Sequence, residues 1–155
     1  RRADDDRALL EYWKKIPADF KVDAQVARAA AEAFMRKGGD DTALGVLEAA
    51  LAHEWREDLL QLYGHVRGSG AKRQIEQAEK WLHAQPRDAQ LLLTLAELCS
   101  VQELWGKAQS YLEAILAIAP SAEAHIRLAE LKEKTGLISE ACANYRKALA
   151  LCRMQ

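Results

Sequence analysis

The feature of this sequence that most constrains its fold is a repeat with a period of 33 residues. Two sets of positions follow this interval: Leu59, Leu92 and His125 in the first, and Ile75, Ala108 and Ala141 in the second. A period in the low thirties, built from two helical segments, is typical of the tetratricopeptide (TPR) solenoid. The sequence therefore predicts an all-α fold in which antiparallel helix pairs stack side by side.

Glycine, proline and helix-capping residues, among them the predicted N-caps Asp88 and Ser121, divide the chain into an N-terminal helix followed by four helix pairs. The predicted ranges are 3–15, then 20–36 with 41–53, 56–66 with 71–84, 88–100 with 104–119, and 121–135 with 138–153. The connections are only a few residues long, so consecutive helices must be antiparallel. We expect residues 1–155 to form a single TPR-like domain. Because the first residue is Arg and not Met, we also expect a fragment of a longer chain.

Two details of helix register are predicted from the apolar pattern. In the first pair, Ala29, Ala30 and Ala33 are expected to face Ala43, Leu47 and Ala50. In the helix over 71–84 the pattern fits less well, because Glu79 falls where the equivalent residues of later repeats are Leu112 and Tyr145. A shift of one residue, which would place Ala78 inward, restores the period. Ala108 is expected to be buried where two helices meet.

Composition excludes several classes of partner. The chain is 50% hydrophobic and 29% charged, with a formal net charge of -1. This balance suits a folded domain with a buried core. Acidic and basic residues are interleaved, so no basic stripe exists that could neutralise a phosphate backbone, and we expect no nucleic-acid partner. No apolar run is long enough to cross a bilayer, so direct membrane insertion by this fragment is not expected.

No catalytic or cofactor-binding motif is found, so we expect neither enzymatic activity nor a bound cofactor or metal. The phosphate-loop, dinucleotide and nucleophile-elbow patterns are all missing. The four histidines are scattered, and none lies at metal-ligand spacing from another histidine or cysteine; His125 is expected to pack as a wall residue. Cys99, Cys142 and Cys152 lie in apolar helical stretches, where they are expected to stay reduced and to pack as small apolar side chains.

A TPR binds its ligands on the concave face, which is lined by the first helix of each pair. The helical period predicts the following groove residues: Ala27, Ala31 and Phe34, then Leu60, Gly64 and Arg67, then Leu93, Glu97 and Ser100, then Ile126, Glu130 and Glu133. Such a groove lacks the lysines and asparagines of carboxylate-clamp TPRs, and it should prefer an apolar segment with a basic flank. An equally weighted alternative is that Leu60, Leu93 and Ile126 only pack between repeats.

Part of the sequence resembles the C-terminal TPR region of HemY-type proteins, the haem-biosynthesis-associated inner-membrane proteins of proteobacteria. The resemblance rests on Trp81-Leu82, Pro86, Leu91 to Leu93, the run Leu104-Trp105-Gly106-Lys107-Ala108, and Tyr111-Leu112. It implies a non-enzymatic scaffold at the inner membrane, of which this chain is a soluble fragment without the N-terminal membrane segment. The side implied is the cytoplasmic one, with the periplasmic side as the alternative. The resemblance also implies that the protein partner is a late haem-biosynthesis enzyme such as ferrochelatase.

Two alternative functions remain open at the level of sequence. A haem or porphyrin carrier would need Cys99, His65 or His125 exposed beside an apolar cleft. A generic TPR adaptor in envelope assembly would need no link to haem. We favour the protein-binding scaffold, because repeat solenoids mainly provide interaction surfaces.

Overall fold

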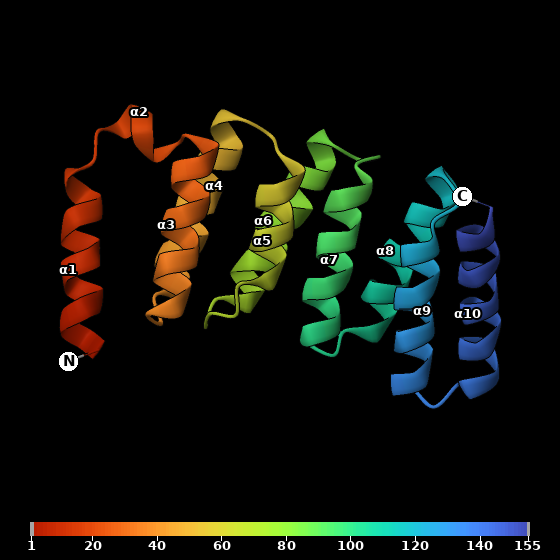
Figure 1. Ribbon diagram of the computed structural model, residues 1–155. Helices are drawn as coiled ribbons and strands as arrows, with labels where there is room; N and C mark the ends of the chain where they lie inside the picture. The colour runs from red at the N-terminus through yellow and green to blue at the C-terminus, as the bar shows by residue number, and fades with distance from the viewer. Residues whose placement is uncertain (1, 155) are drawn as a thin grey trace. The chain divides into compact units, whose positions relative to one another are not determined.

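The computed structural model describes residues 2–154, and the side chains of residues 7–154. Every regular element in this part of the chain is a helix (Figure 1). In order they are α1 (Arg2–Lys15), α2 (Ala18–Lys21), α3 (Ala24–Arg36), α4 (Asp40–His53), α5 (Glu57–His65), α6 (Ala71–Ala84), α7 (Ala89–Val101), α8 (Trp105–Ile118), α9 (Ala122–Lys134) and α10 (Ile138–Arg153). The predicted TPR-like helical-repeat fold is confirmed.

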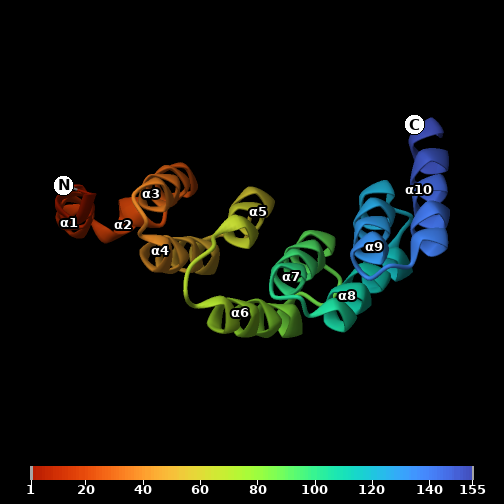
Figure 2. The same cartoon turned by 90° about the horizontal axis from the view of Figure 1, so that it is seen from below.

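The chain forms two compact units, Arg1–Gln74 and Ile75–Gln155, and the division falls within α6. In the first unit α3 packs against α4, and α5 contacts both of them. In the second unit α7 packs against α8 and α9 against α10, while α9 also contacts α8. Figure 2 shows α3 beside α4, α7 beside α8 and α9 beside α10. The single domain over 1–155 stays a prediction.

The helix predicted over 20–36 is wrong, because the structure divides it at Asp23. The short α2 ends at Lys21, and the Asp23 carboxylate then accepts hydrogen bonds from the backbone N–H groups of Gln25 and Val26 at 3.0 and 3.1 Å. This is the arrangement of a helix N-cap, which starts a new helix even where the apolar period continues. The predicted caps Asp88 and Ser121 do the same for α7 and α9.

Three first helices of the pairs end in the same way. Gly38 after α3 and Gly136 after α9 have φ angles of 83° and 81°, the left-handed conformation that glycine adopts without cost. The equivalent residue after α7 is Glu103, whose φ is 59°. In each case the following N–H group bonds a carbonyl five residues earlier, as Leu104 does to Cys99 at 2.8 Å. Glu103 therefore carries a backbone strain that the two glycines avoid.

The one-residue shift predicted in α6 is confirmed. Ala78 is fully buried, whereas Glu79 is half-buried and accepts a hydrogen bond from the Tyr111 hydroxyl at 3.0 Å. The register predicted for α3 is wrong, because Ala29 is exposed, whereas Ala27, Ala31 and Phe34 are buried. Residues 27, 31 and 34 recur at helical spacing, so they form one face, and this face packs against the rest of the first unit.

A buried amide at the start of α6 was not anticipated from the sequence. Gln74 is 2% exposed, and its Nε2 donates to the carbonyl oxygens of Tyr63 and Val66 at 2.6 and 3.2 Å. These carbonyls lie at the C-terminal end of α5, where a helix leaves its acceptors without intrahelical partners. The side chain of Gln74 therefore stabilises the end of α5.

Ala108 provides a test of the packing in the second unit. Its side chain is fully buried, so Ala108→Glu places an unpaired carboxylate in the core and should lower the free energy of unfolding by about 3 kcal/mol or more. Ala143 is exposed on α10, so Ala143→Glu is the matched control and should change stability by less than about 0.5 kcal/mol. Urea denaturation followed by circular dichroism measures both. Equal stabilities for the two variants would contradict the register.

Glu103 provides a second test. Glu103→Gly removes the strain of the left-handed conformation, which stabilises the native state. Glycine has a larger backbone entropy in the unfolded chain, which offsets part of this gain. The net free energy of unfolding should rise by about 0.5–1 kcal/mol. Gly136→Ala, at the equivalent position after α9, should lower stability by a similar amount. Thermal melts of the two variants should therefore shift in opposite directions.

Candidate functional site

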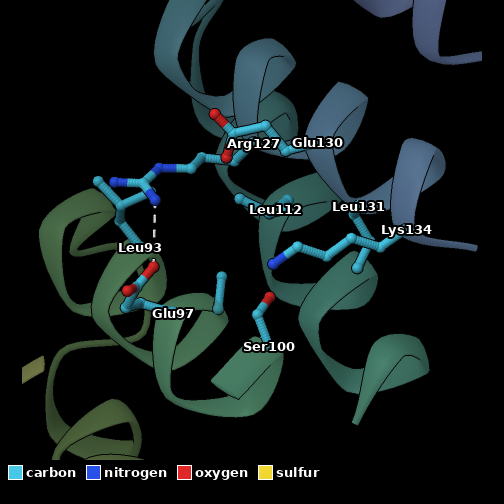
Figure 3. A pocket seen from close by; sticks show the side chains of 9 residues that line it. Leu93, Glu97, Ser100, Leu112, Arg127, Glu130, Leu131 and Lys134 are labelled. Atoms are coloured by element: carbon cyan, nitrogen blue, oxygen red, sulfur yellow. Dashed lines mark hydrogen bonds and ion pairs between the residues drawn. The ribbon is translucent and has the colours of Figure 1, made fainter. Parts of the chain in front are cut away.

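The second unit contains a cavity of about 150 Å³ between α7, α8 and α9 (Figure 3). Its walls come from three helices, and the residues that line it are Leu93, Ala96, Glu97, Ser100, Leu112, Arg127, Glu130, Leu131 and Lys134. Four of the predicted groove residues are among them: Leu93, Glu97, Ser100 and Glu130. The structure thus brings together side chains that are more than 30 residues apart in the sequence, as Figure 3 shows.

The base of the cavity is apolar. Ala96, Leu112 and Leu131 are 3%, 1% and 3% exposed, so they belong to the core of the unit and present only one side to the cavity. Leu93 is half-buried at the rim. Leu112 is fixed by α8 and Leu131 by α9, so the depth of the cavity depends on the contact between these two helices. An apolar side chain of a bound molecule could occupy this base.

One pair of charges in the cavity is already neutralised within the protein. The Arg127 guanidinium bonds the Glu97 carboxylate at 3.1 Å, across the gap between α9 and α7, and the dashed line in Figure 3 marks this contact. Arg127 also lies 3.8 Å from Glu123, one turn earlier on α9. The side chains of Arg127 and Glu97 are 37% and 25% exposed, so the pair is partly screened by solvent. The predicted acidic character of this part of the groove is therefore reduced.

Two further charged groups on α9 have no ion pair within the described residues. Glu130 is exposed at the rim. The Lys134 ammonium lies 5.8 Å from the centre of the Trp105 ring, a cation–π contact that holds it over α8. In Figure 3 the Lys134 side chain points toward Ser100. The rim thus offers a carboxylate, an ammonium and a hydroxyl to a ligand.

The other predicted groove residues of the second unit lie outside the cavity. Ile126 is 37% exposed on α9. The Glu133 carboxylate beside the Tyr145 hydroxyl of α10, together with burial and the further negative charges nearby, raises the pKa of Tyr145 to about 12. These two residues extend the surface beyond the cavity without lining it.

The predicted groove residues of the first unit do not form an open surface. Ala27, Ala31, Phe34, Leu60 and Gly64 are all buried. Phe34 packs edge-on against Trp13, with ring centres 6.2 Å apart.

Arg67 is exposed, but its guanidinium donates to the carbonyl oxygens of Gly64 and Val66, where it caps the end of α5. The alternative that Leu60 packs in the core therefore agrees with its burial, whereas Leu93 and Ile126 remain accessible.

The sequence prediction missed five of the nine residues that line the cavity: Ala96, Leu112, Arg127, Leu131 and Lys134. On α9, Arg127, Leu131 and Lys134 share a face with Glu130 because their spacing is three or four residues. This spacing could have been found by widening the predicted stripe by one position. Leu112 could not have been predicted from this spacing, because it belongs to the second helix of a pair. Only the tertiary structure places it against α9.

The residues that a haem carrier would require do not line the cavity. Cys99 is fully buried, and burial raises the pKa of its thiol to about 11. His65 is exposed on α5, and the Nδ1 atom of His125 lies 3.2 Å from the side-chain oxygen of Asn144. No cluster of three metal-binding side chains occurs among the described residues.

The expectation that all three cysteines pack as apolar side chains is wrong for two of them. Cys142 and Cys152 are exposed on α10. Cys99 alone is in the core. The apolar residues around positions 142 and 152 suggested burial, but they form a stripe on an outer surface.

Neither a family profile nor a curated protein matches the chain. Among solved structures it is similar to several of MamA. For MamA MSR-1 the TM-score is 0.62 at 20% sequence identity, with 95% of this chain and 86% of that chain covered. For MamA AMB-1 the TM-score is 0.63 at 18% identity, with 99% and 93% covered. For MamA from Desulfovibrio magneticus RS-1 the TM-score is 0.53 at 17% identity, with 87% and 97% covered.

These similarities establish the TPR-like helical-repeat fold and nothing further. At such low identity a shared fold does not carry function from one protein to another. None of the comparisons links the chain to HemY-type proteins or to haem synthesis. A search of the described helices for one long and apolar enough to cross a membrane finds none.

Thiol reactivity provides a test of the burial of Cys99 and the exposure of the other two cysteines. At a pH of about 8, well below its raised pKa, Cys99 should stay protonated and unreactive toward a thiol reagent, whereas the exposed Cys142 and Cys152 should react. Titration with a chromogenic disulfide should therefore count two thiols in the native protein and three after denaturation. The Cys99→Ala variant, as a control, should give two under both conditions.

Proposed function

We propose that this chain is a non-enzymatic protein-binding module, and that the cavity between α7, α8 and α9 holds a short segment of its partner. The observation that carries the proposal is the combination of an apolar base with rim charges that have no ion pair in the described residues. Ligand sites commonly combine an apolar lining with a few polar groups that fix orientation. The likeness to MamA supports a helical-repeat scaffold, since such folds mainly offer extended binding surfaces.

The geometry favours a particular kind of segment. Its central side chain would be apolar and small enough for a cavity of about 150 Å³, where it would contact Leu93, Leu112 and Leu131. A basic side chain on one flank would pair with Glu130. On the other flank an acidic group or a backbone carbonyl would face the ammonium of Lys134 and the hydroxyl of Ser100. Charge complementarity of this kind fixes orientation and specificity more than affinity.

The resemblance to HemY-type proteins makes a late haem-biosynthesis enzyme at the inner membrane the first partner to test. That narrower proposal rests on the sequence resemblance alone. An adaptor with a different partner would use the same cavity, so the experiment is designed around the cavity and not around the identity of the partner.

Photo-crosslinking tests the proposal. A photoreactive phenylalanine analogue at Leu93 should crosslink a partner in native extracts, whereas the same analogue at Val101 should not, because Val101 is exposed on α7 and does not line the cavity. The double change Leu93→Asp with Glu130→Lys should reduce capture of that partner at least tenfold, because it puts a charge at the apolar rim and inverts the carboxylate.

The matched control is Val101→Asp with Glu113→Lys, since Glu113 is exposed on α8 outside the cavity. Both double variants should keep their helix content in circular dichroism. Equal capture by the two double variants would locate the binding site elsewhere. Loss of helix content in the cavity variant alone would assign Leu93 to the core.

A further inference from the structure

The last helix, α10, carries an exposed apolar stripe that nothing in the proposed function uses. Ile138, Tyr145 and Leu149 are 58%, 37% and 52% exposed, and Cys142 and Cys152 are exposed as well. These positions are separated by four, three, four and three residues, so they lie on one face of the helix. Ala141 and Ala148, on the neighbouring face of the helix, are buried. Figure 1 shows α10 beside α9 at the C-terminal end of the second unit.

The repeat itself shows what covers such a face. The equivalent positions on α8, 33 residues earlier, include Trp105, Gln109, Leu112 and Leu116, and each of them is buried or half-buried. They are covered because α9 packs against α8. Lys132 of α9 bonds the side-chain oxygen of Gln109 at 3.2 Å, and Lys134 lies over the Trp105 ring. The stripe on α10 continues this helix-binding face by one repeat.

The charges beside the stripe distinguish its occupant from α9. Arg146 and Arg153 follow Tyr145 and Cys152 directly, so both lie along the same edge of the stripe, and both are exposed without an ion pair in the described residues. At the position equivalent to Arg146, α8 carries Glu113. The sign of the charge at this edge is therefore reversed between the two helices.

We propose that the stripe on α10 binds an amphipathic helix of a separate protein, one with an apolar face and carboxylates along the edge that meets Arg146 and Arg153. The apolar face provides burial, and the carboxylates set the orientation. A second copy of this chain fits less well. An antiparallel pair of α10 helices centred on Tyr145 would bring Arg146 beside the same arginine of the other copy, and like charges in contact are unfavourable.

The probe is a fluorescent peptide with the sequence of residues 120–136 in which Ala129 and Lys132 are replaced by glutamate. Lys132 lies against Gln109, and because α9 runs antiparallel to α8, residue 129 lies one turn closer to the position equivalent to Arg146. The peptide keeps the large apolar side chains of α9 and adds carboxylates on this edge; the unaltered sequence is the matched peptide. By fluorescence anisotropy the acidic peptide should bind the whole chain at least tenfold more tightly than the unaltered one. Arg146→Glu should remove this preference, and Leu149→Glu should weaken binding of both peptides at least tenfold.

Val101→Glu is the control for a new exposed glutamate and should not alter binding, and the cavity variant Leu93→Asp with Glu130→Lys should not either. Binding of the peptides to α10 is therefore tested independently of the partner proposed for the cavity. Equal affinity for the two peptides, or undiminished binding by Leu149→Glu, would overturn the proposal. It would also be overturned if light scattering found a dimer that Leu149→Glu dissociates, since the occupant would then be a second copy.

Discussion

The close approach of helices at buried alanines is the constraint on which the second unit depends. Ala108 on α8, Ala141 and Ala148 on α10, and Ala124 and Ala129 on α9 are almost completely buried. A side chain with one methyl group allows two helix backbones to lie near each other, and any larger residue would push them apart. Because α9 is held against both α8 and α10, the cavity has a fixed depth.

Charge in this protein is used mainly for local pairing, which leaves few groups for a partner. The Arg127 guanidinium neutralises Glu97 inside the cavity, and Glu79 accepts from Tyr111 and pairs with Lys107 at 3.5 Å. Partly exposed pairs of this kind contribute about 0–1 kcal/mol each to stability. Their effect on recognition is larger, because they decide which charges remain for a ligand. Glu130 and Lys134 remain at the cavity, and Arg146 and Arg153 remain on α10.

The two proposed surfaces differ in physical character. The cavity between α7, α8 and α9 is small and has a polar rim, which suits one side chain of an extended segment. The stripe on α10 is long and apolar with a basic edge, which suits a helix. A protein with both could hold two partners at once, which is a common property of repeat scaffolds.

The sequence by itself determined the fold class, the pairs α3–α4, α7–α8 and α9–α10, the caps at Asp88 and Ser121, and the burial of Ala78 and Ala108. These follow from local chemistry: a helical period, a capping carboxylate or hydroxyl, and glycines where the backbone turns left-handed. The sequence also placed Leu93, Glu97, Ser100 and Glu130 on the accessible side of their helices.

Only the tertiary structure decided which helix faces are covered. Ala27 and Phe34 are buried although the helical period predicted them in the groove, and Leu60 is buried where the period left groove and core open. Cys142 and Cys152 are exposed although their neighbours are apolar. Leu112 and the pairing of Arg127 with Glu97 also required the structure. The physical reason is that an apolar stripe specifies that a face can be buried, but the contact between two helices depends on packing with residues far away in the chain.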